Sequence, residues 1–224
     1  MKYSSLILGE LSDIQQQHKQ RLMSVLKKYL PPRAVEYCSE LVMHYKLHLH
    51  IEVERQDRLG DYSPHLGKGN RISINHNLNP FDFLITFIHE LAHHVAYKRF
   101  GDKHQPHGME WKEAYKDCMR PFLMRNIFPS DIAAPLTKHM QYPRYTHTTD
   151  VNLMKSLMQY DLEKKILLEQ LPRGATFKLR KNSKIILRKG EQVKDYFLCS
   201  DLTKGTTYKV FSVAKIFPEP TSKT

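Results

Sequence analysis

A single predicted helix, residues 80–100, constrains the fold of this chain more than any other segment. Asn79 is a favourable N-cap and Pro80 suits the first helical position. At the other end, Gly101 is well suited to ending a helix. Apolar residues recur at steps of three and four along the segment: Leu84, Ile88, Leu91 and Val95. The helix must therefore bury one side against the rest of the chain.

The centre of this helix carries His89 and His93 in the pattern H-E-x-x-H. Residues four apart share a helix face, so both imidazoles can bind one metal ion. Glu90 stands where a glutamate can act as a general base without being a ligand. His94 lies about 100° round the helix from His93, so we expect it behind the ligands or at the surface. The alternative is a buried helix whose histidines only form hydrogen bonds; the capping residues and apolar stripe favour metal binding.

A catalytic zinc site needs a third protein ligand and an open fourth position. The metzincin spacing would require glycine and histidine where this chain has Ala96 and Arg99, which excludes that class. Four candidates follow the helix: His104, His107, Glu110 and Glu113. We favour His107, because Gly108 lets the backbone come close and a helical segment follows. Glu113 is the second choice and His104 the third.

Two segments before the metal-binding helix are predicted as strands. Residues 47–54 alternate strictly between apolar and polar, and residues 71–75 carry two isoleucines on one face. We expect them to pair as a hairpin across the turn-rich residues 60–70. An exposed strand edge beside a metal site can bind an extended peptide by strand addition. We interpret His48 and His50 as exposed positions rather than metal ligands.

Helices are expected to surround this centre, which makes the fold class α+β. The predicted helices are residues 12–30, 32–45, 109–119 and about 149–160, with short helical pieces within residues 125–148. Pro121 is expected to end or bend the third of them. The only tryptophan, Trp111, is expected to anchor the core.

The periodicity changes in the C-terminal part of the chain. Four short strands are predicted: residues 174–180, 184–188, 196–199 and 208–211. The expected turns are Lys181–Asn182, Lys189–Gly190 and Lys204–Gly205. We therefore predict two domains, residues 1–165 around the metal-binding helix and residues 166–224 as a small basic β module.

The segment HELAHH at residues 89–94, followed by PHGMEW at residues 106–111, resembles the SprT-like metallopeptidases. The eukaryotic DNA–protein crosslink proteases of the Spartan type are related to this family. The resemblance includes residues 60–62, 72–75, 78–80 and 160–161 and covers most of the chain from about residue 41. It implies a zincin-like core in which His89, His93 and His107 bind zinc and Glu90 is catalytic. It also implies that the substrates are DNA-associated or DNA-crosslinked proteins.

The C-terminal module resembles the zinc ribbon that many SprT-like proteins carry. A ribbon needs four ligands and only Cys199 remains here, so we predict a ribbon-like module held by apolar packing, without zinc. With Cys38 and Cys118, the cysteines are three and widely separated, which is typical of a reducing compartment. The apolar run at residues 6–8 is too short for a signal peptide, and no run is long enough to span a membrane. We expect a cytoplasmic protein.

The net charge of +12 is distributed unevenly along the chain. Residues 151–224 hold 15 basic and 7 acidic side chains, whereas residues 81–150 hold 9 and 8. The candidate DNA contacts are Lys178, Arg180, Lys181, Lys184, Arg188 and Lys189. A one-sided excess favours phosphate binding with little sequence preference, although a solvated lysine-rich surface is an equal alternative.

Together these features predict a zinc-dependent hydrolase that cleaves peptide bonds in DNA-associated proteins. Residues considered for stabilising the oxyanion are Tyr115, Tyr145 and His147. One alternative is a DNA-binding accessory or regulatory protein whose metal site is structural. Another is a metal-dependent hydrolase of a non-peptide bond.

Overall fold

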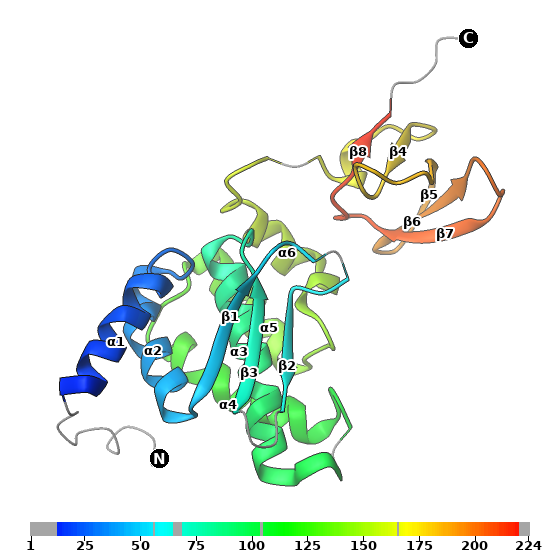
Figure 1. Ribbon diagram of the computed structural model, residues 1–224. Coiled ribbons are helices and arrows are strands. Elements are labelled where there is room, and N and C mark those ends of the chain that lie inside the picture. The colour runs from blue at the N-terminus through cyan, green and yellow to red at the C-terminus, as the bar shows by residue number, and fades with distance from the viewer. Residues whose placement is uncertain (1–12, 56, 65–68, 104, 165, 220–224) are drawn as a thin grey trace. The chain divides into compact units, whose positions relative to one another are not determined.

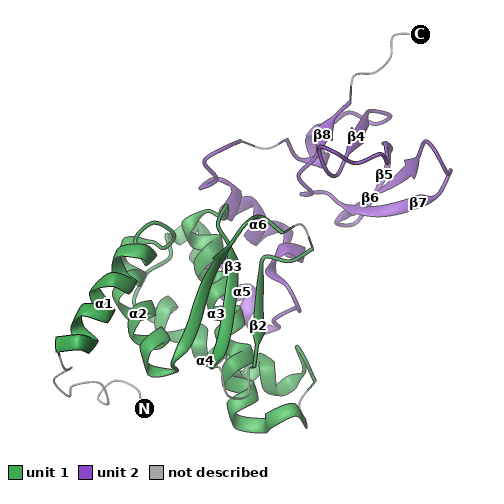
Figure 2. Cartoon of the chain, in the orientation of Figure 1, with its two compact units in different colours: residues 1–133 green, residues 134–224 purple. Residues whose placement is uncertain are grey.

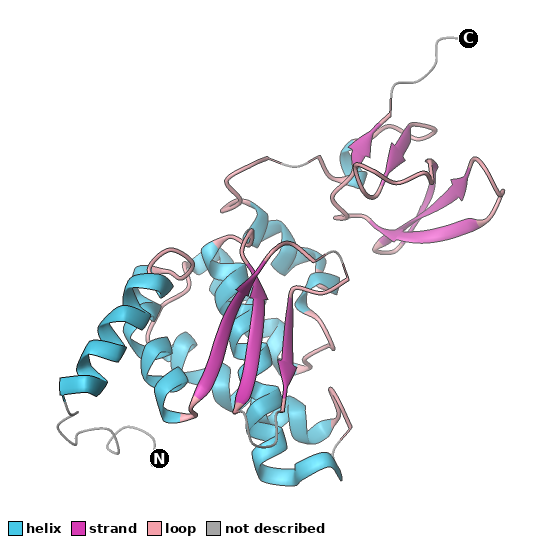
Figure 3. Ribbon diagram, in the orientation of Figure 1, coloured by secondary structure: helices cyan, strands magenta, loops and turns pink. Residues whose placement is uncertain are grey.

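The computed structural model describes residues 13–219, except residues 56, 65–68, 104 and 165. The chain forms two compact units, residues 1–133 and 134–224 (Figure 2). This division falls inside a helix and lies before the boundary that the sequence predicted after residue 165. Helices dominate the first unit, and strands dominate the end of the second (Figure 3).

Unit 1 combines helices with one small sheet (Figure 1). Its elements in chain order are α1 (Asp13–Leu26), η1 (Pro32–Ala34), α2 (Val35–His44), β1 (Leu47–Glu52), β2 (Gly60–Ser63), β3 (Asn70–Asn75), α3 (Pro80–Phe100), η2 (Gly101–Lys103) and α4 (Met109–Met124). Helix α5 (Ser130–Gln141) begins in unit 1 and ends in unit 2. The α+β fold class is thus confirmed.

The three-stranded sheet has the order β1-β3-β2. β1 pairs with β3 in parallel, and β2 pairs with β3 antiparallel. The predicted hairpin of residues 47–54 and 71–75 is therefore wrong, because β2 lies between them in the chain and forms the antiparallel pair instead. β2 was missed because Gly60 and its polar neighbours resemble a turn. The strand forms because it packs on α3 and pairs with β3.

Helix α3 has the boundaries that its capping residues predict. The Asn79 side chain accepts hydrogen bonds from the backbone N–H groups of Phe81 (3.1 Å) and Asp82 (3.0 Å). Gly101 follows the last turn with φ 63°, a conformation that glycine adopts without strain. The helix packs against the sheet, where Ile72 and Ile74 of β3 are fully buried.

Helix α4 continues through Pro121 to Met124, whereas the sequence predicted an end or bend at that proline. An interior proline costs a helix about 3 kcal/mol. Phe122 directly after it is completely buried and its ring lies 5.1 Å from that of Tyr37. Burial of an aromatic side chain stabilises by a comparable amount, about 2–3 kcal/mol, so packing keeps the last turn helical.

Unit 2 begins with helices. After α5 they are η3 (His147–Thr149), α6 (Val151–Met158) and η4 (Leu168–Gln170). Residues 125–148 thus contain one twelve-residue helix as well as short pieces. The side chain of Asp150 caps α6 by accepting from the Leu153 N–H. Within the described residues, no helix combines the length and apolar character needed to cross a bilayer.

The remaining strands of unit 2 form an antiparallel sheet. They are β4 (Thr176–Lys178), β5 (Leu187–Val193), β6 (Tyr196–Asp201), β7 (Thr207–Phe211) and β8 (Phe217–Pro218), in the order β7-β6-β5-β4-β8. The predicted apolar packing is confirmed by a buried cluster: Leu168, Phe177, Leu187, Phe197, Cys199, Val210 and Ile216. The likeness to a zinc ribbon stays a prediction.

The predicted turn at Lys189–Gly190 is wrong, because both residues lie inside β5. A Cβ added to Gly190 would lie 2.4 Å from the carbonyl oxygen of Leu198 on β6. This glycine is needed for close approach of two strands rather than for a turn. The chain reverses instead at Lys194, which has φ 54°.

Candidate metal centre

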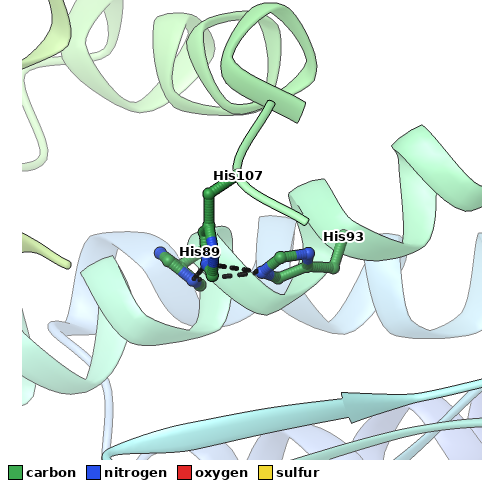
Figure 4. Close-up of side chains that lie close together, drawn as sticks. All are labelled: His89, His93 and His107. Carbon is green, nitrogen blue, oxygen red and sulfur yellow. Dashed lines mark hydrogen bonds between the residues drawn. The ribbon is translucent and has the colours of Figure 1, made fainter. Parts of the chain in front are cut away.

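Three histidines from two neighbouring segments converge in unit 1 (Figure 4). His89 and His93 project from one face of α3, as their spacing predicts. His107 stands just before α4 and adopts φ 61°, in the left-handed region. Gly108, the N-cap of α4, leaves little space for a side chain, because a Cβ would lie 3.0 Å from the Gln105 carbonyl oxygen.

The Nε2 atoms of the three histidines form a nearly equilateral triangle. His93 lies 3.2 Å from His89 and 3.1 Å from His107, and His89 lies 3.2 Å from His107. Zinc–nitrogen bonds of about 2.0–2.1 Å at tetrahedral angles place two ligand nitrogens about 3.3 Å apart. The group could therefore hold one metal ion, and its spacing fits tetrahedral coordination with a fourth position for another ligand.

Hydrogen bonds alone do not explain this triangle. A hydrogen bond needs one ring nitrogen that carries a proton and one that does not. With three nitrogens in mutual contact, at most two of the three pairs can meet that condition, and the third pair must be two like atoms. A cation at the centre would instead attract the lone pairs of all three nitrogens. The donor set of three imidazoles is one that zinc accepts.

The surroundings of the triangle favour neutral imidazoles. Burial lowers the pKa of His107, so its ring is held in the form that binds metal. The fully buried ring of Trp111 lies beneath all three histidines, at centroid distances of 4.7, 5.2 and 4.7 Å from His89, His93 and His107. Trp111 is thus the predicted core anchor, and it also limits how these rings can tilt.

Glu90 packs between α3 and β2. Its side chain is almost fully buried, and a Cβ added to Gly60 would lie 2.7 Å from its Oε1 atom. Burial raises the pKa of Glu90 to about 8, and the charge of Asp61 adds to this rise. The positive charges of Arg55 and Arg58 act in the opposite direction and lower this pKa. A divalent cation nearby would also lower the pKa and favour the charged base.

The other ligand candidates are not part of this group. Glu113 is exposed on α4, and neither it nor Glu110 belongs to the one metal-binding group found among the described residues. His104 lies outside the described residues. His94 is fully buried, so of its two expected positions, behind the ligands or at the surface, the surface position is wrong. Its Nδ1 atom lies 3.3 Å from the Tyr62 hydroxyl.

The structure brings one further residue to the site. Gly60 of β2 lies against Glu90, yet the sequence suggested no role for it beyond family resemblance. The signal available was a glycine directly before alternating polar and aromatic residues. Of the residues considered for the oxyanion, Tyr115 is buried and stacks on Trp111 at 4.9 Å. Tyr145 and His147 belong to unit 2, where Tyr145 is exposed and His147 is buried.

The basic residues of the β module divide into two groups. Lys189 is buried, donates hydrogen bonds to the carbonyls of Glu169 (3.1 Å) and Leu171 (2.5 Å), and lies 3.9 Å above the Phe197 ring. It is internal, so its prediction as a DNA contact is wrong. Lys178 pairs with Glu219 at 2.9 Å. The exposed members are Arg180, Lys181, Lys184 and Arg188.

Comparisons of the chain with protein-family models, curated proteins and solved structures found no match. The geometry of the site and the chemistry of its residues therefore indicate its function.

Proposed function

We propose that this chain is a zinc-dependent peptidase of the SprT-like type. The observation that carries the proposal is the triangle of three Nε2 atoms at 3.1–3.2 Å, formed by an H-E-x-x-H helix and a histidine beyond it. Three histidines with an available fourth position are typical of a catalytic zinc site, whereas structural zinc sites are closed by four protein ligands.

The proposed roles follow from the chemistry of each side chain. His89, His93 and His107 would hold the ion, which when bound would activate water and polarise the substrate carbonyl. Glu90 would accept the proton of the attacking water and pass it to the departing amine. Its burial beside β2 keeps bulk water from competing for that proton. Gly60 would leave the carboxylate the space that this role needs.

Strand β2 is the proposed binding edge for the substrate chain. Both β1 and β2 lie at an edge of the sheet, but only β2 carries a residue in contact with Glu90. Its outer backbone groups can pair with an extended peptide through main-chain hydrogen bonds. A peptide bound in this way would depend little on its side chains, which suits an enzyme acting on diverse proteins.

We further propose that the substrates are proteins bound or crosslinked to DNA, and that the β module supplies affinity for DNA phosphates. Four exposed cations within nine residues support this: Arg180, Lys181, Lys184 and Arg188. Such a surface binds phosphates by releasing counterions from DNA and has no preference for the base sequence. The basic side chains that are internal or paired contribute less to it.

The proposed function is tested with zinc-loaded protein and a DNA-crosslinked protein substrate, with and without added DNA. We expect cleavage that stops when a chelator removes the metal and returns when zinc is restored. If the protein substrates remain uncleaved although each chain binds one zinc ion, the peptidase proposal is wrong. That result would favour a DNA-binding accessory protein with a structural metal. Cleavage of small amides alone would instead indicate a hydrolase of another bond.

Removal of exposed charge from the β module is expected to weaken DNA binding. Each phosphate contact contributes about −0.9 to the slope of log K against log salt, so Lys181→Gln with Lys184→Gln should flatten the slope by up to about 1.8. A matched control removes two exposed charges from unit 1, Lys27→Gln with Lys28→Gln, and is expected to leave the slope nearly unchanged. The measurement is a salt titration of fluorescently labelled duplex DNA. Equal slopes in the two variants would contradict the assignment to the module.

A further inference from the structure

Strand β2 runs along α3 in the same direction as the helix. Gly60 lies against the side chains of Thr86 and Glu90, because a Cβ added to it would lie 2.7 Å from an atom of each. Two residues further along the strand, the hydroxyl of Tyr62 lies 3.3 Å from Nδ1 of His94, one turn further along the helix. β2 is also an edge of the sheet (Figure 1). An extended peptide paired with this edge would therefore run beside α3.

Tyr97 lies on the side of α3 between the metal-binding face and β2. It follows His93 by four residues, which turns it by only about 40° around the helix from that histidine. The turn is toward β2, because the centroids of the Tyr97 and Tyr62 rings are 6.3 Å apart. An ion shared by His89 and His93 would lie midway between them, about 9 Å from Tyr97 along the helix axis. An extended peptide covers this distance in about three residues.

The rings of Tyr62 and Tyr97 form an open corner. Their planes are tilted by 56°, and both side chains are half-buried. The Tyr62 ring is fixed, because its hydroxyl lies 3.1 Å from Oδ1 of Asn70 and its ring lies edge to face with His94 at a centroid distance of 5.6 Å. Tilted aromatic rings at such distances can accept a further ring in an edge-to-face or offset contact. The corner therefore suits an aromatic or large apolar group.

We propose that Tyr62 and Tyr97 form a subsite for an aromatic or large apolar side chain of the substrate, about three residues from the cleaved bond. Tyr62 pairs with Ile72, which is buried on the α3 side of the sheet, so the Tyr62 ring lies on that side as well. A peptide paired with β2 places every second side chain on the same side. The subsite deepens the proposed function and rests on it for the position of the cleaved bond.

The subsite is tested first by peptide affinity, which needs no cleavage. The protein is the zinc-loaded full chain with Glu90→Gln, and the probes are polar decapeptides with one Phe or one Ala at a scanned position. At the best position we expect Phe to bind about tenfold more tightly than Ala, because ring contact and apolar burial act together. Adding Tyr97→Ala should reduce this ratio to below about twofold.

Two further variants are the controls for this measurement. Tyr97→Phe keeps the ring and should retain the preference for Phe. Tyr142→Ala removes an exposed tyrosine of unit 2 and should also leave the preference unchanged. Equal affinity for the Phe and Ala peptides at every position would overturn the inference. A preference that persists in Tyr97→Ala would overturn it as well.

The second test locates the cleaved bond in the same peptides with the wild-type protein and mass spectrometry. We expect the bond to lie about three residues from Phe and to move with Phe along the peptide. Tyr97→Ala should lower kcat/KM for the Phe peptide about tenfold through KM and leave the Ala peptide unchanged. A cleaved bond that does not follow Phe would overturn the subsite. Absence of cleavage, with the Phe preference in binding intact, would overturn the proposed function and leave a peptide-binding site.

Discussion

Replacing Glu90 by Gln is expected to reduce peptide hydrolysis by a factor of about 10² to 10⁴. Glutamine has nearly the same size as glutamate and fits the same space against Gly60. Its amide is planar like the carboxylate, so the side chain should stay in place beside β2. Its amide cannot take a proton from water, so the loss should appear in kcat. The measurement is the cleavage rate per bound zinc.

A matched control is Glu113→Gln, the same change at an exposed position on α4. We expect it to retain activity and zinc, because Glu113 is not part of the metal-binding group. Both variants should bind one zinc and unfold at nearly the wild-type temperature. If Glu90→Gln kept more than about a tenth of the activity, Glu90 would not be the general base. Loss of zinc in Glu113→Gln would make Glu113 a ligand instead.

Replacing His107 by Ala is expected to weaken zinc binding by more than about 100-fold and to abolish activity with it. Mutation of a residue that only orients a metal ligand lowers metal affinity about 10- to 100-fold, so loss of a direct ligand should lower it by more. His89 and His93 would remain on α3, but two ligands hold zinc poorly. The measurement is zinc affinity by competition with a chelating dye.

The backbone at His107 needs a control of its own. Its φ of 61° is strained for any residue except glycine, so Ala changes the ligand and keeps the strain. His107→Gly removes both the imidazole ligand and the backbone strain. We therefore expect His107→Gly to be more stable than His107→Ala and to bind zinc no better. His104→Ala is expected to leave affinity and activity nearly intact. Affinity retained in His107→Ala and lost in His104→Ala would move the third ligand.

Local chemistry explains what could be predicted from the sequence. Asn79, Pro80 and Gly101 determine the ends of α3 through their own hydrogen bonds and backbone preferences. The four-residue spacing of His89 and His93 then places both rings on one face whatever the rest of the chain does. His107 was chosen from four candidates by its neighbours, and the structure brings it within 3.2 Å of the other two.

Features that depend on distant residues could not be predicted in this way. Strand β2 has no alternation of its own and exists because β3 and α3 adjoin it. The parallel pairing of β1 with β3 follows from that insertion. Lys189 resembles its exposed neighbours in the sequence, and only the carbonyls of Glu169 and Leu171 show that it is internal. Counting charges along a chain cannot separate these cases.

The buried ammonium of Lys189 also determines where the β module begins. Its two carbonyl acceptors belong to residues of η4 and the turn after it, which precede the first strand of the sheet. Leu168, directly before Glu169, is part of the same buried cluster as the strands. A chain severed at Leu162, which is fully exposed, would leave the ammonium and its acceptors together. A chain severed after Leu171 would leave the buried Lys189 ammonium without its hydrogen-bond acceptors, which is costly. The module is therefore complete only when it starts before Leu167.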